Sequence, residues 1–222
     1  MILQLSTGYY DAALNFNCMD KAFPSFLILR LLFQPTEAFN KLATMQPSPI
    51  SVVIKFALWM GLLPPIFAYF GAANHGWNLG TIEPLYLPNN ILFGISVAYF
   101  IALLIGFVTT AVLSRWMAST YGARHALGIH FAMISIVGAP IALGSIIHLY
   151  PDVFINILVL IPAILWSMYL LYRGLPIVLH TTPERGMLMA SSLIGYFLVA
   201  LVSLLGITVV IWGYGIGPTL GI

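Results

Sequence analysis

Charged side chains are scarce in this sequence, and their scarcity decides its class. Only 6% of the 222 residues are Asp, Glu, Lys or Arg, whereas soluble domains carry about 25%. So few charges cannot cover a water-exposed surface. The net charge of +2 is spread along the chain, which excludes a nucleic-acid partner because that would need clustered Lys and Arg. The 61% of hydrophobic residues instead indicate an integral membrane protein in contact with membrane lipids.

Groups that catalyse reactions or hold cofactors are also few. The single cysteine, Cys18, excludes an internal disulfide and a Cys-rich metal site. The histidines do not share one depth on facing helices, as a haem or metal site requires. No nucleophile beside a base, carboxylate pair or phosphate-binding loop is evident. We therefore predict no catalytic residues, no cofactor and no metal. We expect His130, one turn inside a predicted span, to find a partner within the protein.

Apolar stretches long enough to cross the bilayer are the main feature of the chain. A helix needs about 20 residues to cross about 30 Å of hydrocarbon. Five stretches qualify: Ile50 to Ala73, Asn90 to Trp116, Ala126 to His148, Val153 to Tyr172 and Met187 to Trp212. The sequence thus predicts an all-α polytopic membrane protein with five transmembrane helices.

Lys and Arg fall on one side of this predicted arrangement. Seven of the eight lie in the leader or around the second and fourth connections: Lys21, Arg30, Lys41, Arg115, Arg124, Arg173 and Arg185. The eighth, Lys55, lies about one turn inside the first span, near enough to the cytoplasmic surface for its side chain to snorkel. The opposite connections carry Glu83 and Asp152 but no Lys or Arg. Because positive flanks are retained in the cytoplasm, we predict a cytoplasmic N terminus and a C terminus on the other side.

The leader, residues 1–49, is expected to lie on the cytoplasmic membrane surface. The apolar stretch from Phe23 to Phe33 is too short to span. After Pro35, which suits a first helical position, apolar and charged residues alternate with helical spacing. We expect two short amphipathic interfacial helices before Pro47 and Pro49 interrupt the chain. Residues 50–222 then form the five-helix transmembrane domain.

The third predicted helix carries small residues at steps of three or four, which places them on one stripe. They are Gly128, Ala132, Ser135, Ala139, Ala142 and Ser145. Such a stripe lets another helix approach closely. It is a candidate helix-packing interface, either within this chain or with a second membrane protein in a homo- or hetero-oligomer.

The fourth connection, from Tyr172 to Arg185, is the most distinctive polar segment. We expect Gly174 to end the fourth helix and Pro176 to discourage its restart, while Thr182 and Pro183 begin the fifth helix. Together with the leader, this connection forms a candidate cytoplasmic surface. Its residues are Arg30, Glu37, Lys41, Tyr172, Arg173, Gly174, Pro176, Pro183, Glu184 and Arg185.

Three short segments resemble the Yip family (Ypt-interacting proteins), in its bacterial branch. They are LFQPTEAF at Leu32–Phe39, YLLYRGLP at Tyr169–Pro176 and TTPERG at Thr181–Gly186, and the resemblance covers about Leu31 to Trp212. It implies the five-span plan, a bacterial inner membrane and a periplasmic C terminus. Eukaryotic members act in early secretory trafficking through Rab GTPases. Their leader motif Asp-Leu-Tyr-Gly-Pro is absent here, so the Rab-binding role is not carried over.

The leading hypothesis is a non-enzymatic adaptor that binds other integral membrane proteins or organises lipids through its cytoplasmic surface. An accessory subunit of a larger complex is a related possibility. The alternative is a passive channel or small-solute permease with a cavity among the proline-containing first, third and fourth helices. A continuous inward-facing polar path from Asn90 through Thr109, Thr110 and Ser114 would favour that alternative.

Overall fold

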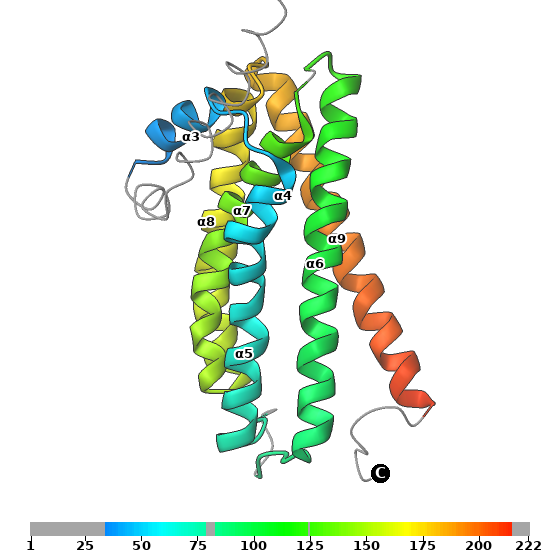
Figure 1. The fold of residues 1–222 in the computed structure, drawn as a ribbon. Helices are drawn as coiled ribbons and strands as arrows, with labels where there is room; N and C mark the ends of the chain where they lie inside the picture. Colours follow the sequence, from blue (N-terminus) through cyan, green and yellow to red (C-terminus); the bar gives the residue numbers. More distant parts are fainter. Residues whose placement is uncertain (1–33, 79–82, 124, 215–222) are drawn as a thin grey trace, which may run out of the picture.

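The structure is a bundle of long helices (Figure 1). The computed structural model describes residues 34–78, 83–123 and 125–214. Within them, five helices are long and apolar enough to cross a membrane. Their ranges are Pro49–His75, Asn89–Thr120, Leu127–Leu149, Val153–Val178 and Pro183–Val210. The predicted all-α, five-span fold class is confirmed. The expected helix at Phe23–Phe33 lies outside the described residues.

The first span is built of three consecutive segments. They are α4 (Pro49–Val52), a π-helical turn η1 (Val53–Ala57) and α5 (Leu58–His75). The next spans are α6 (Asn89–Thr120), α7 (Leu127–Gly144) with its 3-10 extension η2 (Ser145–Leu149), α8 (Val153–Val178) and α9 (Pro183–Gly213). The short helix α3 (Pro35–Ala43) precedes them.

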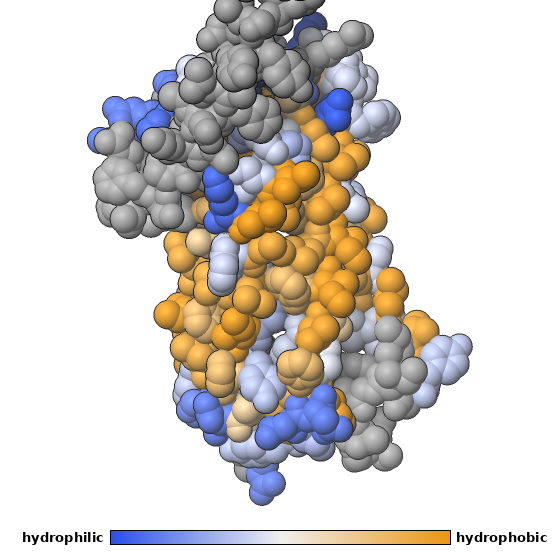
Figure 2. All heavy atoms as spheres, in the orientation of Figure 1, coloured by the Kyte–Doolittle hydropathy of each residue, from blue (hydrophilic) through white to orange (hydrophobic). Residues whose placement is uncertain are grey.

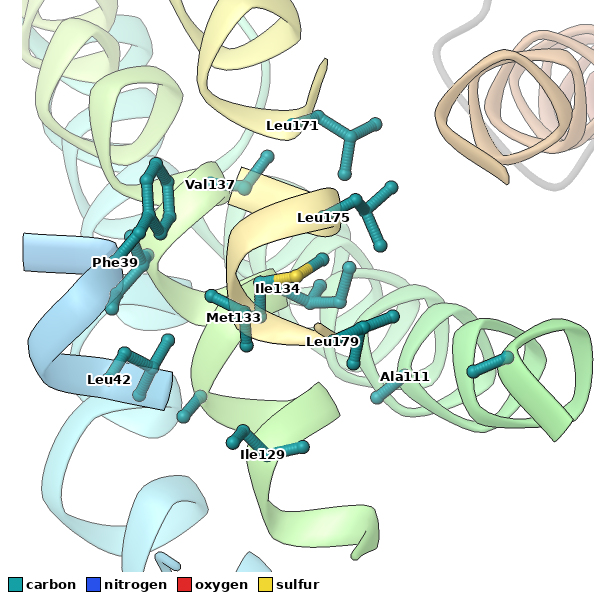
Figure 3. Packing of buried hydrophobic residues seen from close by; sticks show 14 of the residues in the cluster. Phe39, Leu42, Ala111, Ile129, Met133, Ile134, Val137, Leu171, Leu175 and Leu179 are labelled. Carbon is teal, nitrogen blue, oxygen red and sulfur yellow. The ribbon is translucent and has the colours of Figure 1, made fainter. Parts of the chain in front are cut away.

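Helix α7 forms the centre of the bundle. It contacts α3, α4, α5, α6 and α8. Its residues from Gly128 to Val137 are all buried, so no face of this stretch is left to lipid. Figure 3 shows Phe39 and Leu42 of α3 extending into the apolar cluster formed with α7 and α8. A helix that is apolar on every side is expected at such a central position.

Helix α3 is amphipathic and lies across one end of the bundle (Figure 1). Ala38, Phe39 and Leu42 are buried, whereas Glu37 and Lys41 are exposed. Pro35 occupies its first turn, where a missing backbone N–H has no helical partner to lose. Of the two predicted amphipathic helices, the one that follows Pro35 is therefore present, with its apolar face packed against the bundle. We call the end formed by α3, the last turns of α6 and α8 and the start of α9 the α3 end.

The outer surface of the bundle is apolar along its length. Figure 2 shows an apolar band between hydrophilic ends, as expected for a protein surrounded by lipid. Exposed side chains include Phe154 and Leu158 of α8, each 73% exposed. Helix α9 runs away from α6 toward its C-terminal end (Figure 1), and every residue from 201 to 210 is exposed.

The end opposite α3 is held by backbone and side-chain contacts between two connections. Asn78 donates a backbone hydrogen bond to Pro151 (3.0 Å) and a side-chain hydrogen bond to the Asp152 carboxylate (2.9 Å). Asp152 also caps α8 by accepting from the backbone N–H of Ile155 (3.0 Å). A Cβ added to Gly71 of α5 would lie 1.9 Å from the carbonyl oxygen of His148 in η2.

Candidate functional site

The predicted cytoplasmic surface divides into exposed side chains and residues that hold the α3 end together. Arg30 lies outside the described residues. Glu37, Lys41, Arg173, Pro183, Glu184 and Arg185 are exposed, Tyr172 and Pro176 are half-buried, and Gly174 is buried. The charged members thus face outward, while the glycine and the aromatic and proline rings lie further in. The contacts of the buried and half-buried residues explain this difference in exposure.

Gly174 provides the contact between α3 and α8. A Cβ on Gly174 would lie 2.6 Å from Cε1 of Phe39, so the aromatic ring rests on the bare backbone of α8. The Phe39 ring itself is fully buried. The absence of a side chain at Gly174 therefore lets α3 pack directly against α8, which joins the family-like segments around residues 39 and 174 in space.

The prediction that Gly174 ends the fourth helix and that Pro176 prevents its restart is wrong. Helix α8 continues through both residues to Val178. Gly174 is used for close packing rather than as a terminator. Pro176 lies near the end of the helix, and its carbonyl accepts a hydrogen bond from the backbone N–H of Thr181 (3.1 Å).

The end of α8 is a Schellman motif with histidine in the usual glycine position. The Thr181 N–H bonds to Pro176 and the His180 N–H to Ile177, at 3.1 and 3.4 Å. His180 has a φ of 45°, the left-handed conformation that this motif requires at that position. This ending is hard to predict from the sequence, because glycine is the residue expected at that position.

Helix α6 ends in the same way with a glycine. Gly122 has a φ of 81°. The backbone N–H of Ala123 donates to the Ala118 carbonyl (2.9 Å), and the N–H of Gly122 donates to the Ser119 carbonyl (3.3 Å). Its left-handed conformation is easily adopted without a Cβ. Two helices thus terminate at the α3 end with their carbonyl groups directed toward the connections.

Two side chains link these helix ends across the site. His125 Nε2 lies 3.0 Å from the carbonyl oxygen of Leu179 at the end of α8. Arg185 of α9 donates from Nη1 to the carbonyl oxygen of Tyr121 at the end of α6 (3.0 Å). Each bond satisfies a carbonyl that the helix leaves without a partner. The second and fourth connections are therefore fastened to each other.

The beginning of α9 follows the sequence prediction. The Thr182 hydroxyl lies at the N-cap position, 3.5 Å from the N–H of Arg185, and Pro183 occupies the first position of the helix. Gly186 is buried against Pro176, whose Cδ would lie 2.8 Å from an added Cβ. The segment TTPERG thus packs against the segment YLLYRGLP.

His130 has the partner that its depth required. Its Nδ1 lies 2.9 Å from the Ser114 hydroxyl, and both side chains are fully buried between α6 and α7. Two hydrogen bonds between hydroxyl groups join α9 to the bundle. They link Thr109 with Tyr196 (2.6 Å) and Tyr172 with Ser191 (2.9 Å). These bonds are the interhelical polar contacts expected inside a membrane protein.

The residues named for a channel path have other roles in the structure. Asn90 is exposed near the end opposite α3. Thr109 contacts Tyr196, Thr110 donates to the Gly106 carbonyl (2.6 Å), and Ser114 is paired with His130. Their hydroxyls are used within the chain, so these residues do not form the continuous inward-facing polar path that the channel alternative requires.

All six residues of the small-residue stripe are buried. Gly128 lies against the leader, because an added Cβ would be 1.7 Å from the carbonyl oxygen of Pro47. Ala132 is fully buried and Ser135 donates to the Phe131 carbonyl in its own helix (2.8 Å). The stripe therefore makes its contacts in this structure with the same chain.

Among residues 34–78, 83–123 and 125–214, no three His, Asp or Glu side chains lie close enough together to hold a metal ion.

Comparison with known proteins identifies a family and curated relatives that are similar to this chain in sequence. The sequence model of a family described as "Yip1 domain" matches residues 29–204. Two curated relatives, both called "Inner membrane protein YohC", come from Escherichia coli K12 and Escherichia coli O6:H1. Each is 32% identical over 158 residues, which are 71% of this chain and 81% of the relative. No solved structure matches. The residues matched by the family model include α3 and the two connections that meet at the α3 end.

Proposed function

This chain belongs to the Yip1 domain family, and from that premise we propose that it is a non-enzymatic adaptor that docks another integral membrane protein at its α3 end. Its relatives and its five apolar helices make it an integral inner-membrane protein. The observation that supports the proposal is the assembly of the α3 end. The family-like segments contact one another there, with Phe39 on Gly174 and Gly186 on Pro176.

A preassembled surface favours docking, because fewer side chains and loops have to become ordered when a partner binds. Ordering of side chains and loops opposes association, by about 0.5–1.5 kcal/mol for each immobilised flexible side chain. Here α3 is fixed by its buried face, and the two connections are fastened by His125 and Arg185. A partner would meet a surface whose backbone is already in place.

The chemistry of the α3 end suits recognition of a protein. Arg115, Arg173 and Arg185 are exposed, and Trp116 is 65% exposed beside Arg115. Arginine and tryptophan are enriched among the residues that contribute most to protein–protein binding. Glu37 and Glu184 add exposed negative charge to the same end. This mixture of signs fits a protein surface better than a uniformly anionic lipid layer.

We place the α3 end in the cytoplasm and the C terminus in the periplasm. The Lys and Arg residues of the described chain are Lys41, Lys55, Arg115, Arg173 and Arg185, all toward the α3 end. The opposite end carries Glu83 and Asp152. This distribution supports the orientation through retention of positive flanks on the cytoplasmic side.

Site-specific photocrosslinking in cells tests the docking surface. A photoreactive amino acid is placed at Asn40, which is exposed at the α3 end, and at Leu158, an exposed control in the span of α8. We expect one discrete adduct with an integral membrane protein from Asn40, and none from Leu158.

Charge variants connect this adduct to the proposed surface. With the probe at Asn40, Arg173→Glu is expected to remove most of the adduct, and Arg173→Lys to retain it, because an exposed positive charge is kept. An adduct of equal yield from Leu158, or one indifferent to Arg173→Glu, would contradict docking at the α3 end.

A further inference from the structure

A cavity lies between α5, α6 and α8, away from the α3 end. Its volume is about 580 Å³, within the range of about 300–1,000 Å³ that ligand pockets occupy. It is open on one side rather than enclosed. The residues that line it are Ala68, Trp77, Ile95, Tyr99, His148, Pro151, Val153, Asn156, Ile157, Leu160, Ile161 and Ile164.

Polar and apolar lining residues are separated along α8. His148 and Asn156 lie where α8 begins, and their side chains are hydrogen-bonded to each other. From there to Ile164 the α8 wall is apolar, over about 12 Å at 1.5 Å per residue. The cavity therefore has a polar rim at the end of the bundle and an apolar α8 wall that extends to the level of the spans.

The polar rim offers little to water or to a small polar solute. Asn156 donates from Nδ2 to the carbonyls of Tyr150 (3.1 Å) and Asp152 (2.7 Å), besides its contact with His148. Water enters a cavity only where it finds two to four polar partners. An apolar ligand with one polar end matches this lining.

The charge around the rim indicates which polar group that ligand would carry. Asp152 lies next to Val153 and Pro151, which line the cavity, and Glu83 belongs to the connection on the same end. Among the described residues, no Lys or Arg lies at this end. The negative charge of Asp152 disfavours an anionic headgroup at this rim and favours an ammonium group.

We propose that this cavity binds one acyl chain of phosphatidylethanolamine, with the ammonium headgroup at the Asp152 rim. The chain lies along Ile157, Ile161 and Ile164, where close contact with the wall adds dispersion attraction. Trp77 lines the rim, where an amphipathic ring meets both headgroup and chain. This lipid site is separate from the docking surface at the α3 end, so either proposal can fail without the other.

Native mass spectrometry of the full chain tests the site. The protein is released from nanodiscs that contain equal amounts of phosphatidylethanolamine and phosphatidylglycerol with identical acyl chains. Ile157→Trp places an indole in the cavity, while Leu158→Trp makes the same change on the adjacent residue, which is 73% exposed and does not line it. Ala68→Phe fills the cavity from the α5 wall. Thermal unfolding establishes that each variant is folded.

We expect the parent and Leu158→Trp to retain one phosphatidylethanolamine, and occupancy to fall about tenfold, equivalent to about 1.4 kcal/mol, in Ile157→Trp and Ala68→Phe. Equal retention by the folded cavity-filling variants would overturn the site. Preferential retention of phosphatidylglycerol would overturn the assigned headgroup, and with it the proposal.

Discussion

Single residues without side chains set how closely the elements of this protein approach. At Gly174 the neighbour is an aromatic ring, whereas at Gly128 it is the backbone carbonyl of Pro47. A ring can shift by a small rotation, but a carbonyl is fixed by the chain on either side. The glycines Gly138 and Gly195 meet nothing within 4 Å of an added Cβ. The presence of a glycine in the sequence therefore does not identify a close contact, because its role depends on which group lies beside it.

Gly174→Ala is predicted to loosen α3 from α8. The added Cβ would lie 2.6 Å from the Phe39 ring, and such overpacking typically costs about 1–3 kcal/mol. Gly138→Ala is the matched control, because it brings the same helix-propensity gain of about 1 kcal/mol into open space. We expect the melting temperature in detergent to be lower for Gly174→Ala than for Gly138→Ala, and proteolysis between α3 and α4 to be faster. Identical behaviour of the two variants would mean that the contact does not constrain α3.

At the scale of elements, the sequence predicted the spans well and their ends less well. Five apolar stretches appear as five long helices because length and hydropathy are local properties. Helix α8 was expected to stop near Tyr172 but continues to Val178, since Gly174 serves packing with α3, a contact distant in sequence. The partner of His130 was required by its depth, but its identity as Ser114 depends on how α6 and α7 lie together.

Local features of the candidate site were predictable from the sequence, but the contacts that join its segments were not. The charged residues of the fourth connection are exposed as a solvated loop requires, and Thr182 and Pro183 begin α9 as their residue types indicate. The bonds from His125 to Leu179 and from Arg185 to Tyr121 join elements far apart in the chain. No local pattern specifies such pairs, because they arise only when the helices pack.

Helix α7 is predicted to tolerate no enlargement along its small-residue stripe. Ala132 is fully buried and Ala139 is 2% exposed, so Ala132→Leu and Ala139→Leu insert methylene groups into a filled interior, at a cost of about 1–3 kcal/mol each. Ser135→Ala should be mild, because its hydroxyl bonds only within its own helix to Phe131. Thermal unfolding in detergent ranks the variants. Equal stability of both Leu variants and the parent would show that the stripe is not tightly packed.

At the scale of the whole molecule, the two ends differ in charge and in construction. The α3 end carries the described Lys and Arg residues and is fastened by side chains that bond to helix-terminal carbonyls. The opposite end is held by Asn78 and Asp152 and carries acidic residues. Between them the surface is apolar (Figure 2). A molecule with this asymmetry is expected to insert in one orientation, since moving positive loops across the membrane is disfavoured.

Cysteine labelling is predicted to place the α3 end inside the cell. Cys18 is the single cysteine, so Cys18→Ser gives a background for single substitutions. Tyr214→Cys, at a position that is 81% exposed near the C terminus, should react with a membrane-impermeant maleimide in spheroplasts. Asn40→Cys, on the exposed side of α3, should react only after the inner membrane is lysed. Tyr86→Cys, 62% exposed in the connection before α6, should behave like Tyr214→Cys because both lie at the end opposite α3. The reverse pattern would invert the orientation and move the docking surface to the periplasm, while labelling of both ends in intact spheroplasts would contradict a single orientation.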